Sequence, residues 1–296
     1  MCIRDSEIIR DQKVDAAFIA TNNLTHTEIA LKLIHGGKHC IVEKPIATSL
    51  DDARAIYDAA KQSGVSVTIN HMMLQNAYNK KAAQLVTRGT LGDVKEIDLH
   101  IEFLLGATEE DRTAWRCFNP DERGGPVGDT GSHCLYMAEF LVGSPITNVA
   151  CTFTPATLPI NAENGAYIRV EFENGARGVI NVSFNRDFGS EEALLTYLGY
   201  EIYGTKGIIR VYGALGQLSG HPDEPIPLRL LVDNFRQIRE EKVTDITNIY
   251  RAVIEYHAQS IMNNTLLNVE EAIHNLQLVL AAYESAQQQG TIQEIH

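Results

Sequence analysis

The sequence predicts an α/β fold, in which a short parallel sheet with covering helices precedes an α+β domain built on a large, mostly antiparallel open sheet. Two patterns support this prediction. The first third alternates short apolar runs with amphipathic stretches, which indicates repeated βα units. From about residue 90, longer strands with alternating polarity follow, and helices return near the C-terminus. The 296 residues suffice for two ordinary domains, which we expect over residues 1–90 and 91–296.

The first predicted domain alternates strands with helices. Residues 14–20 form a mostly apolar run of strand length, and residues 25–35 place apolar side chains at helical spacing. Thr25 and Glu28 match a capping box at the start of this helix, and Gly36-Gly37 marks its end. The following elements are strands at 39–43 and 65–69 and helices at 49–61 and about 77–88.

The second predicted domain contains most of the strands. Asn174-Gly175, between two of them, favours a two-residue hairpin. The predicted strands cover 94–105, 146–154, 167–172, 178–184, 196–203 and 208–211, and the predicted helices cover about 131–142, 246–262 and 269–288.

Charge and composition argue against several kinds of partner. The formal net charge is -13, whereas nucleic acid and anionic lipid require clustered Lys and Arg, so we expect neither as a partner. No segment reaches the roughly 20 apolar residues of a membrane helix, and the start lacks the features of a signal peptide. We therefore expect a cytoplasmic protein. Five widely spaced cysteines and no helically aligned histidine pair predict no metal site.

Polar residues follow each strand of the predicted parallel sheet, at the edge where such sheets bind ligands. They are Thr21-Asn22-Asn23, Glu43-Lys44-Pro45 and Asn70-His71. Pro45 biases Lys44 toward an extended backbone, so its ammonium is expected at this edge, within reach of a substrate hydroxyl. The alternative is a solvated loop lysine beside Glu43.

A second group of candidate residues lies in the glycine-rich segment RGGPVGDTGSH at 123–133. Asp129 and His133 are four residues apart, so a helix that begins near Asp129 places them on one face. A histidine suits proton transfer near neutral pH, and a carboxylate can fix its tautomer or bind a sugar hydroxyl. The alternative is a capping aspartate and a surface histidine. Trp115 and Arg116 are ambiguous in the same way, because a lone tryptophan is more often part of a core.

Five stretches together resemble the Gfo/Idh/MocA family, which includes glucose-fructose oxidoreductase and inositol dehydrogenase. They are DAAFIATNNLTH at 15–26, GGKHCIVEKP at 36–45, WRCFNPDERGGPVGDTGSH at 115–133, YGTKGIIRV at 203–211 and NVEEAIHNLQLVLAAYESAQQQG at 268–290. The resemblance implies a Rossmann domain followed by a domain that carries a sugar site. It implies hydride transfer between NAD or NADP and a carbinol carbon of a sugar, polyol or sugar derivative. It also implies a homo-oligomer formed through the C-terminal sheet.

The resemblance assigns roles to individual residues. Lys44, Asp129 and His133 match the family's catalytic positions, with His133 exchanging the hydroxyl proton. The positions that match cofactor contacts are Thr21, Asn22, Asn23, His26, Glu43, Lys44, Pro45, Asn70, Trp115 and Arg116.

The chain also departs from the family pattern. Met73-Leu74-Gln75 stands where many relatives have an Arg-Phe pair, and Tyr136 stands where many have aspartate. The glycine-rich first βαβ unit of a Rossmann domain is missing, since only Met1–Lys13 precede the first predicted strand. We therefore expect a truncated parallel sheet and weak dinucleotide binding. The identity of the sugar and the choice between NAD and NADP stay open.

Two other functions fit the same resemblance. One is an NAD-dependent glycosidase that oxidises its substrate transiently. The other is a non-catalytic ligand sensor or structural relative. The presence of Lys44, Asp129 and His133 favours catalysis, because a sensor has no need of a set of proton-transferring residues.

Overall fold

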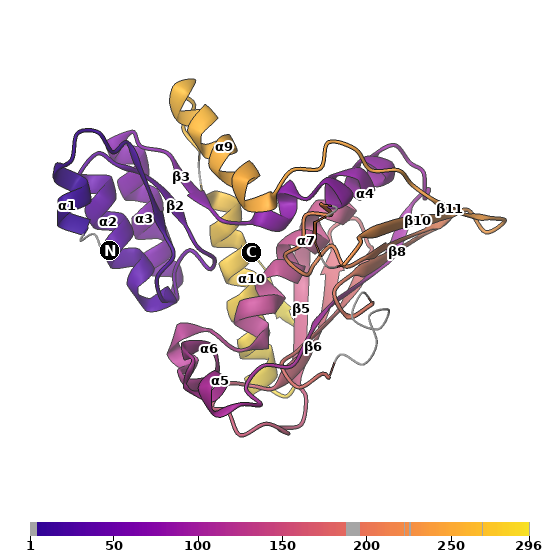
Figure 1. Cartoon of the computed structure of the whole chain (residues 1–296). Coiled ribbons are helices and arrows are strands. Elements are labelled where there is room, and N and C mark those ends of the chain that lie inside the picture. Colours follow the sequence, from indigo (N-terminus) through magenta and orange to yellow (C-terminus); the bar gives the residue numbers. More distant parts are fainter. Residues whose placement is uncertain (1–4, 188–195, 222, 225, 268, 296) are drawn as a thin grey trace.

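The computed structural model describes residues 5–187, 196–221, 223–224, 226–267 and 269–295. It consists of a small α/β unit beside a larger sheet with helices on one face (Figure 1). The small unit contains α1 (Asp5–Arg10), β1 (Ala16–Ile19), α2 (His26–His35), β2 (His39–Val42), α3 (Leu50–Ser63) and β3 (Val67–Ile69).

The strands of the small unit form a parallel sheet in the order β1-β2-β3. Successive side chains of a strand point to opposite faces. Cys40 and Val42 of β2 accordingly pack in the core formed with α2 and α3, whereas Ile41 packs against Val253 of α9 (Ile249–Met262) on the other face. Helices on both faces confirm this part of the predicted fold class.

The larger sheet has nine strands in the order β11-β10-β9-β8-β4-β7-β6-β5-β12. Only β4 and β7 are parallel neighbours among the described strands of this sheet, which confirms the mostly antiparallel prediction. The strands are β4 (Val94–Glu102), β5 (Ile146–Phe153), β6 (Gly165–Phe172), β7 (Arg177–Ser183), β8 (Tyr200–Gly204), β9 (Ile208–Tyr212), β10 (Arg229–Asp233), β11 (Ile238–Glu240) and β12 (Gln293–Glu294).

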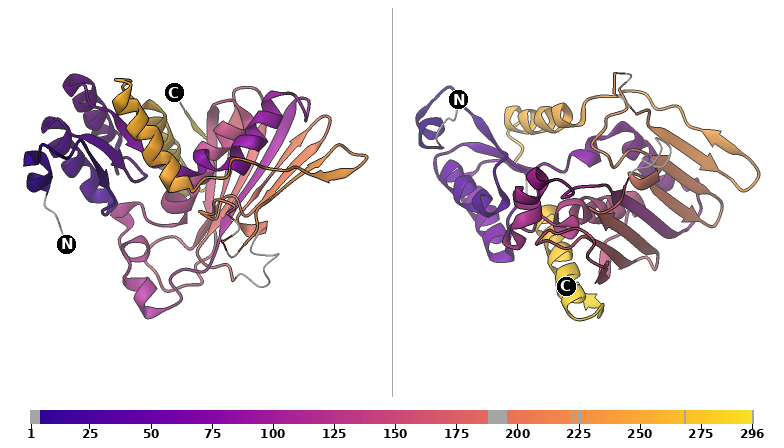
Figure 2. Two further views of the ribbon diagram at one scale, coloured as in Figure 1. Left: turned by 45° about the horizontal axis from the view of Figure 1, so that its top comes forward. Right: turned by 60° about the horizontal axis from the view of Figure 1, so that its bottom comes forward.

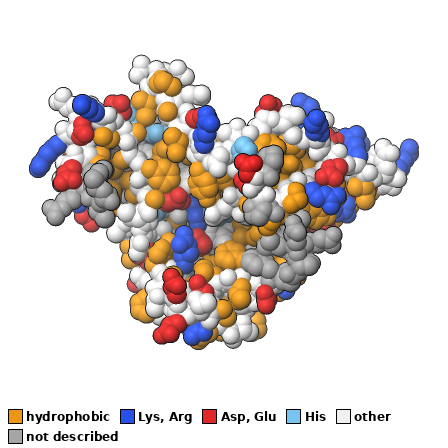
Figure 3. Space-filling model, viewed as in Figure 1, with side chains coloured by type: hydrophobic (Ala, Val, Ile, Leu, Met, Phe, Trp, Pro, Cys, Tyr) orange, Lys and Arg blue, Asp and Glu red, His pale blue; other side chains and the backbone are white. Residues whose placement is uncertain are grey.

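One face of this sheet is covered by helices, as Figure 2 shows. The covering helices are α4 (Ala77–Thr87), α7 (Ser132–Val142) and α10 (Glu270–Gln287). The other face is open: Tyr167, Arg169 and Glu171 of β6 alternate outward from buried neighbours. On the face shown in Figure 3, positive and negative side chains are interspersed over both parts of the molecule.

Helix α10 contributes to the cores of both parts. Ala272 and Leu276 near its start pack in the core of the small unit. The core under the large sheet contains three residues from further along the same helix, Leu278, Val279 and Ala282. The C-terminal helix therefore completes a core whose other members come from the first 70 residues and from Val269.

Several details differ from the sequence predictions. The capping box at Thr25 is absent, because the Thr25 hydroxyl instead lies 2.7 Å from the Asn22 carbonyl oxygen, to which it can donate, and 2.7 Å from the Thr21 hydroxyl. The strand predicted at 196–203 begins only at Tyr200. The hairpin at Asn174-Gly175 forms, but Gly175 alone of this pair has a positive φ, of 83°. Strands β10, β11 and β12 were not predicted.

Short helical segments connect the main elements near the ends of the strands. They are η1 (Asn23–Thr25), η2 (Met72–Gln75), α5 (Glu109–Thr113), α6 (Trp115–Phe118), η3 (Pro120–Glu122) and the π-helical turn η4 (Val127–Gly131). Within the described ranges, no helix is both long and apolar enough to cross a lipid bilayer.

Candidate active site

Lys44 lies just beyond the carboxyl end of β2 and reaches across to the larger part of the molecule. Its Nζ donates to Asp129 Oδ1 at 2.6 Å and to the Asp129 backbone oxygen at 2.7 Å. The lysine side chain is only 7% exposed. An ammonium held by two charge-assisted or polar bonds at this depth has a fixed position, unlike a solvated loop lysine.

Asp129 lies in the π-helical turn η4, directly before α7, and is surrounded by positive charge. Arg116 Nε lies 3.2 Å from its second carboxylate oxygen. Burial alone raises the pKa of Asp129, but the charges of Lys44 and Arg116 outweigh burial and lower the pKa to about 2. Asp129 is therefore a carboxylate at neutral pH, with one oxygen on each of the two cations.

The π-helical turn is held by side chains from distant parts of the chain. Glu163 Oε1 accepts the Val127 N–H and the Tyr283 hydroxyl, both at 3.0 Å, and the Tyr283 oxygen accepts the Gly128 N–H at 3.2 Å. Gly128 is required for close packing here, since a Cβ at this position would lie 2.0 Å from the Arg123 carbonyl oxygen. These contacts fix the backbone that carries Asp129.

His133 lies in the first turn of α7, four residues after Asp129, and is 2% exposed. Its Nδ1 is 2.7 Å from the Tyr136 hydroxyl, and its buried Nε2 has no partner among the described residues. Burial and the nearby charge of Lys44 lower the pKa of His133 well below its ordinary value. His133 is therefore a neutral imidazole at neutral pH.

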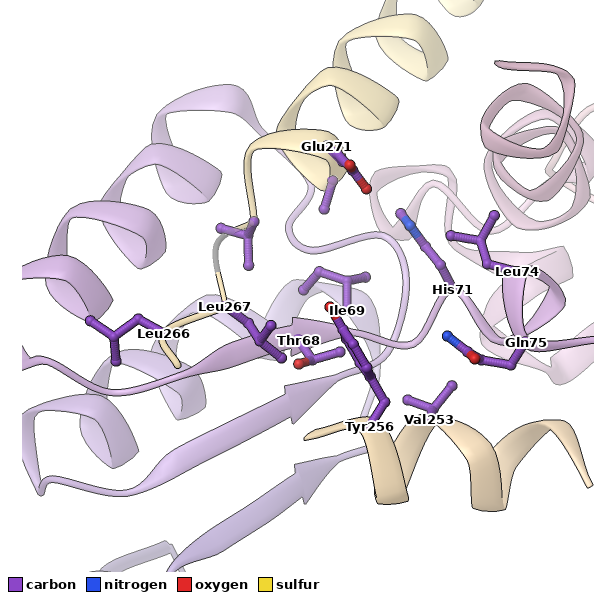
Figure 4. A pocket seen from close by; sticks show the side chains of 12 residues that line it. Thr68, Ile69, His71, Leu74, Gln75, Val253, Tyr256, Leu266, Leu267 and Glu271 are labelled. Carbon is purple, nitrogen blue, oxygen red and sulfur yellow. The ribbon is translucent and has the colours of Figure 1, made fainter. Parts of the chain in front are cut away.

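His71 connects this cluster to two neighbouring cavities. Its ring stacks on the Tyr136 ring, with centroids 4.2 Å apart, and burial together with the Lys44 charge lowers its pKa to about 3. It lines a pocket of about 340 Å³ between the end of β3, α9 and the start of α10, shown in Figure 4. It also lines a cavity of about 530 Å³ beside α7, together with Tyr136. Lys44, Asp129 and His133 line neither.

The loops after β1 and β2 are tied together by His26. This buried ring contacts the Pro45 carbonyl at 2.9 Å through Nδ1 and the Thr21 carbonyl at 3.1 Å through Nε2. Both nitrogens are thus engaged within the protein, so the structure gives His26 a role in joining two loops. Thr21 and Asn22 are exposed at the same sheet edge.

Asn23 and Glu43 also have partners in the protein. Asn23 Nδ2 donates to the Glu122 backbone oxygen at 2.6 Å, which joins the β1 loop to η3. Glu43 Oε1 accepts from Asn70 Nδ2 at 2.7 Å. Asn70 is fully buried, and its Oδ1 has no partner within the described ranges.

Trp115 and Arg116 form one unit beside this cluster. The Arg116 guanidinium lies 4.3 Å from the centre of the Trp115 ring, a separation typical of a cation–π contact. Because Arg116 also binds Asp129, the tryptophan positions a cation of the site. The structure thus brings together Lys44, Asp129, His133 and Arg116, while Thr21, Asn22, His26, Glu43 and Asn70 lie along the edge of the parallel sheet.

Sequence reasoning noted Tyr136 only as a departure from the family pattern, and it missed Glu163 and Tyr283 as members of the site. Tyr136 had a usable indication, since residues three apart on a helix lie on one face and Tyr136 follows His133 by three. Glu163 and Tyr283 had none, because they reach η4 from 36 and 155 residues away in the chain.

Comparisons with known proteins connect this geometry to a family. The model of an oxidoreductase family with an NAD-binding Rossmann fold, GFO/IDH/MocA, matches residues 4–71. The model of the GFO/IDH/MocA C-terminal domain matches residues 79–210. Together the two matches cover more than half of the chain.

Individual relatives are distant and longer. The 1,5-anhydro-D-fructose reductase of Ensifer adhaerens is 28% identical over 203 residues, which cover 68% of this chain and 58% of that protein. The levoglucosan dehydrogenase of Pseudarthrobacter phenanthrenivorans is 27% identical over 228 residues, covering 68% and 56%. The chain thus spans a little over half the length of these curated relatives.

Among solved structures, the aldose-aldose oxidoreductase of Caulobacter crescentus, complexed with glycerol, matches with a TM-score of 0.85. The identity is 20%, and the match covers 98% of this chain and 82% of that one. At this identity the comparison establishes a shared fold.

Proposed function

The chain belongs to the Gfo/Idh/MocA family of oxidoreductases, and we propose that it serves hydride transfer to or from a carbinol carbon of a sugar, polyol or sugar derivative. The observation that supports this most directly is the contact of Lys44 with Asp129, in the turn that leads into the helix carrying His133. A buried cation, a carboxylate and a neutral imidazole gathered at one place form a set suited to proton transfer.

The described residues fit a nicotinamide cofactor at this place. Two buried polar atoms, His133 Nε2 and Asn70 Oδ1, lack partners in the part of the chain that the structure describes, and buried polar atoms normally have them. A bound cofactor and substrate would supply such partners. When bound, NAD or NADP exchanges the hydride with the substrate carbon.

The chain's own residues would then position the substrate and handle its proton. An ammonium has three N–H donors, and Lys44 uses two of them on Asp129. The third is free to bind the reacting oxygen. Asp129 holds the Lys44 side chain in position, Arg116 supports Asp129, and His133 offers its Nε2 to the same oxygen. Thr21, Asn22 and Glu43 would contact the cofactor along the sheet edge.

A neutral, hydroxyl-rich substrate fits this arrangement best. The buried carboxylate of Asp129 is already paired with Lys44 and Arg116, so it offers no free negative charge to a cationic substrate, whereas a neutral hydroxyl can still bind the remaining N–H of Lys44. The names of the two curated relatives, a reductase of an anhydro sugar and a dehydrogenase of levoglucosan, point to the same class.

Self-association through the open face of the large sheet belongs to the same proposal. That face alternates exposed residues such as Tyr167 and Arg169 with buried ones, and no described helix of this chain covers it. Light scattering would test it: a dimer or larger assembly is expected, and a monomer at all concentrations would contradict it. The cytoplasmic location stays a prediction of the sequence.

The enzymatic test uses a panel of sugars and polyols with NAD or NADP, and the matching carbonyl compounds with NADH or NADPH. Lys44→Ala is expected to lower turnover by about 100-fold or more, the usual range for a lost proton-transfer group. The control is Lys32→Ala, which removes a surface lysine paired with Glu28 at 2.6 Å. Equal activity of both variants would refute the role of Lys44. Wild-type inactivity on every pair, at cofactor concentrations high enough to offset the weak dinucleotide binding expected from the sequence, would refute the proposed function.

A further inference from the structure

We propose that Tyr136 is a positioning residue that holds His133 in the neutral tautomer with its proton on Nε2, so that His133 donates a hydrogen bond to the reacting oxygen while Lys44 exchanges the proton. The part about the reacting oxygen rests on the proposed function. The part about the tautomer stands on contacts within the chain.

The direction of the hydrogen bond between Tyr136 and His133 follows from the partners available to the phenol. The Tyr136 oxygen lies 2.7 Å from His133 Nδ1. Within the described ranges, this hydroxyl has no other hydrogen-bond acceptor. If Nδ1 carried the proton, the phenol O–H would have no acceptor among the described residues, which is unfavourable for a largely buried group. Tyr136 therefore donates to Nδ1.

The environment of the phenol supports the same direction. Burial raises the pKa of Tyr136 well above its ordinary value, because a buried phenolate is unfavourable. The phenol therefore keeps its proton, and His133 Nδ1 lies 2.7 Å from the oxygen that carries it.

The charges around His133 keep it neutral. Burial and the charges of Lys44 and Arg116 disfavour a second proton on the ring, and Asp129 is the carboxylate that favours one. Asp129 has its two oxygens on Lys44 and Arg116 already. With Nδ1 accepting from Tyr136 and no second proton, the one ring proton resides on Nε2.

This tautomer decides how the site handles a proton. A neutral imidazole that gave up its Nε2 proton would become an imidazolate, which is a poor outcome in a buried site. His133 therefore keeps its proton and acts as a hydrogen-bond donor, as neutral histidine does elsewhere in carbonyl chemistry. This differs from the exchange of the hydroxyl proton that the family resemblance implies for His133. The oxygen that gains a proton on reduction takes it from the Lys44 ammonium, and the resulting amine regains one from water.

The stacked ring of His71 keeps the tyrosine in place. The two rings are 4.2 Å apart and inclined by 22°, so the phenol cannot swing away from His133 without losing this contact. Tyr136→Phe preserves the ring and its stacking and removes only the hydroxyl, which makes it the variant that isolates the hydrogen bond.

The tautomer is measured by long-range proton–nitrogen NMR of the whole chain labelled with ¹⁵N-histidine, without cofactor or substrate. The His133 signals are those missing from the spectrum of His133→Gln. The expected result near neutral pH is a protonated Nε2 and an unprotonated Nδ1 that accepts a hydrogen bond. In Tyr136→Phe we expect the Nδ1 signal to shift and the tautomers to mix.

Tyr200→Phe is the matched control. This variant removes another buried hydroxyl, which donates to Asn79 Oδ1 at a distance of 2.9 Å and does not contact His133. The His133 signals should therefore stay unchanged. A proton on Nδ1 in the wild-type protein, or a charged ring at neutral pH, overturns the inference even if Tyr136→Phe fails to fold. Because no turnover is involved, an enzyme active with the other tautomer would refute this inference and leave the proposed function intact.

Discussion

The Lys44 ammonium lies 2.6 Å from the Asp129 carboxylate, although 85 residues separate them in the chain. One follows a strand of the parallel sheet, and the other precedes a helix that covers the large antiparallel sheet. The contact places a buried cation where the two parts of the molecule meet. Lys44 contacts one carboxylate oxygen of Asp129, and Arg116 contacts the other.

Asp129→Asn should destabilise the protein strongly. The change keeps the shape of the side chain but leaves Lys44 buried beside an uncharged amide. Removing one partner of a buried ion pair costs roughly 3–5 kcal/mol, and we expect a loss of that size in the free energy of unfolding measured with urea. Asp51→Asn, at a carboxylate that is 98% exposed beside Arg54, should change stability little. Similar losses in both variants would contradict a special role for Asp129.

The same pair predicts how stability depends on acid. Because the folded pKa of Asp129 is lowered from 3.8 to about 2, its charge stabilises the native state at neutral pH. This contribution is lost as the pH falls through that interval. The difference in unfolding free energy between the wild type and Asp129→Asn should therefore shrink over this range. A constant difference down to the lowest pH at which the protein folds would show that the charge is not responsible.

Gly128→Ala should disturb the π-helical turn, because the added Cβ would lie 2.0 Å from the Arg123 carbonyl oxygen. Overpacking of this kind typically costs about 1–3 kcal/mol. Gly131→Ala is the matched control in the same turn, since its Cβ would meet atoms only at 3.4 Å and its backbone is helical. Thermal unfolding of the two variants tests this, and equal melting temperatures would be evidence against the steric argument.

Glu163→Ala and Glu163→Gln should differ. Alanine leaves the buried Val127 N–H and the Tyr283 hydroxyl without their shared acceptor, at a cost of about 1–3 kcal/mol for an unsatisfied group. Glutamine keeps an acceptor oxygen and should be milder. Urea denaturation gives the stabilities, and an alanine variant no less stable than the glutamine variant would show that Glu163 does not hold the turn.

The parts of the fold that the sequence predicted are those with strong local patterns. The parallel strands are short apolar runs separated by helices. Helix α3 is capped at its start by Ser49, whose hydroxyl accepts the Asp52 N–H, and at its end by Gly64, with a positive φ of 65°. Strands β10 and β11 were missed because they are five and three residues long and follow a long irregular segment. The pairing of β10 with β9, and of β11 with β10, is a tertiary effect that no local pattern encodes.

The candidate site was predictable only in part, for a similar reason. The positions of Lys44, Asp129 and His133 followed from motifs, but their partners did not. The sequence left Asp129 with a choice between the histidine and a sugar hydroxyl, whereas in the structure it binds Lys44 and Arg116. His133 instead forms a hydrogen bond with the Tyr136 hydroxyl. Which polar groups meet inside a protein depends on packing between distant segments, and spacing along the chain does not report it.

Helix α10 couples the unfolding of the two parts of the molecule. Its first turns complete the core around β1–β3, and its later turns complete the core under the large sheet. If the helix detaches from either part, that part loses some of its buried apolar side chains. The two halves should therefore melt as one cooperative unit, with a single heat-absorption peak in calorimetry rather than two.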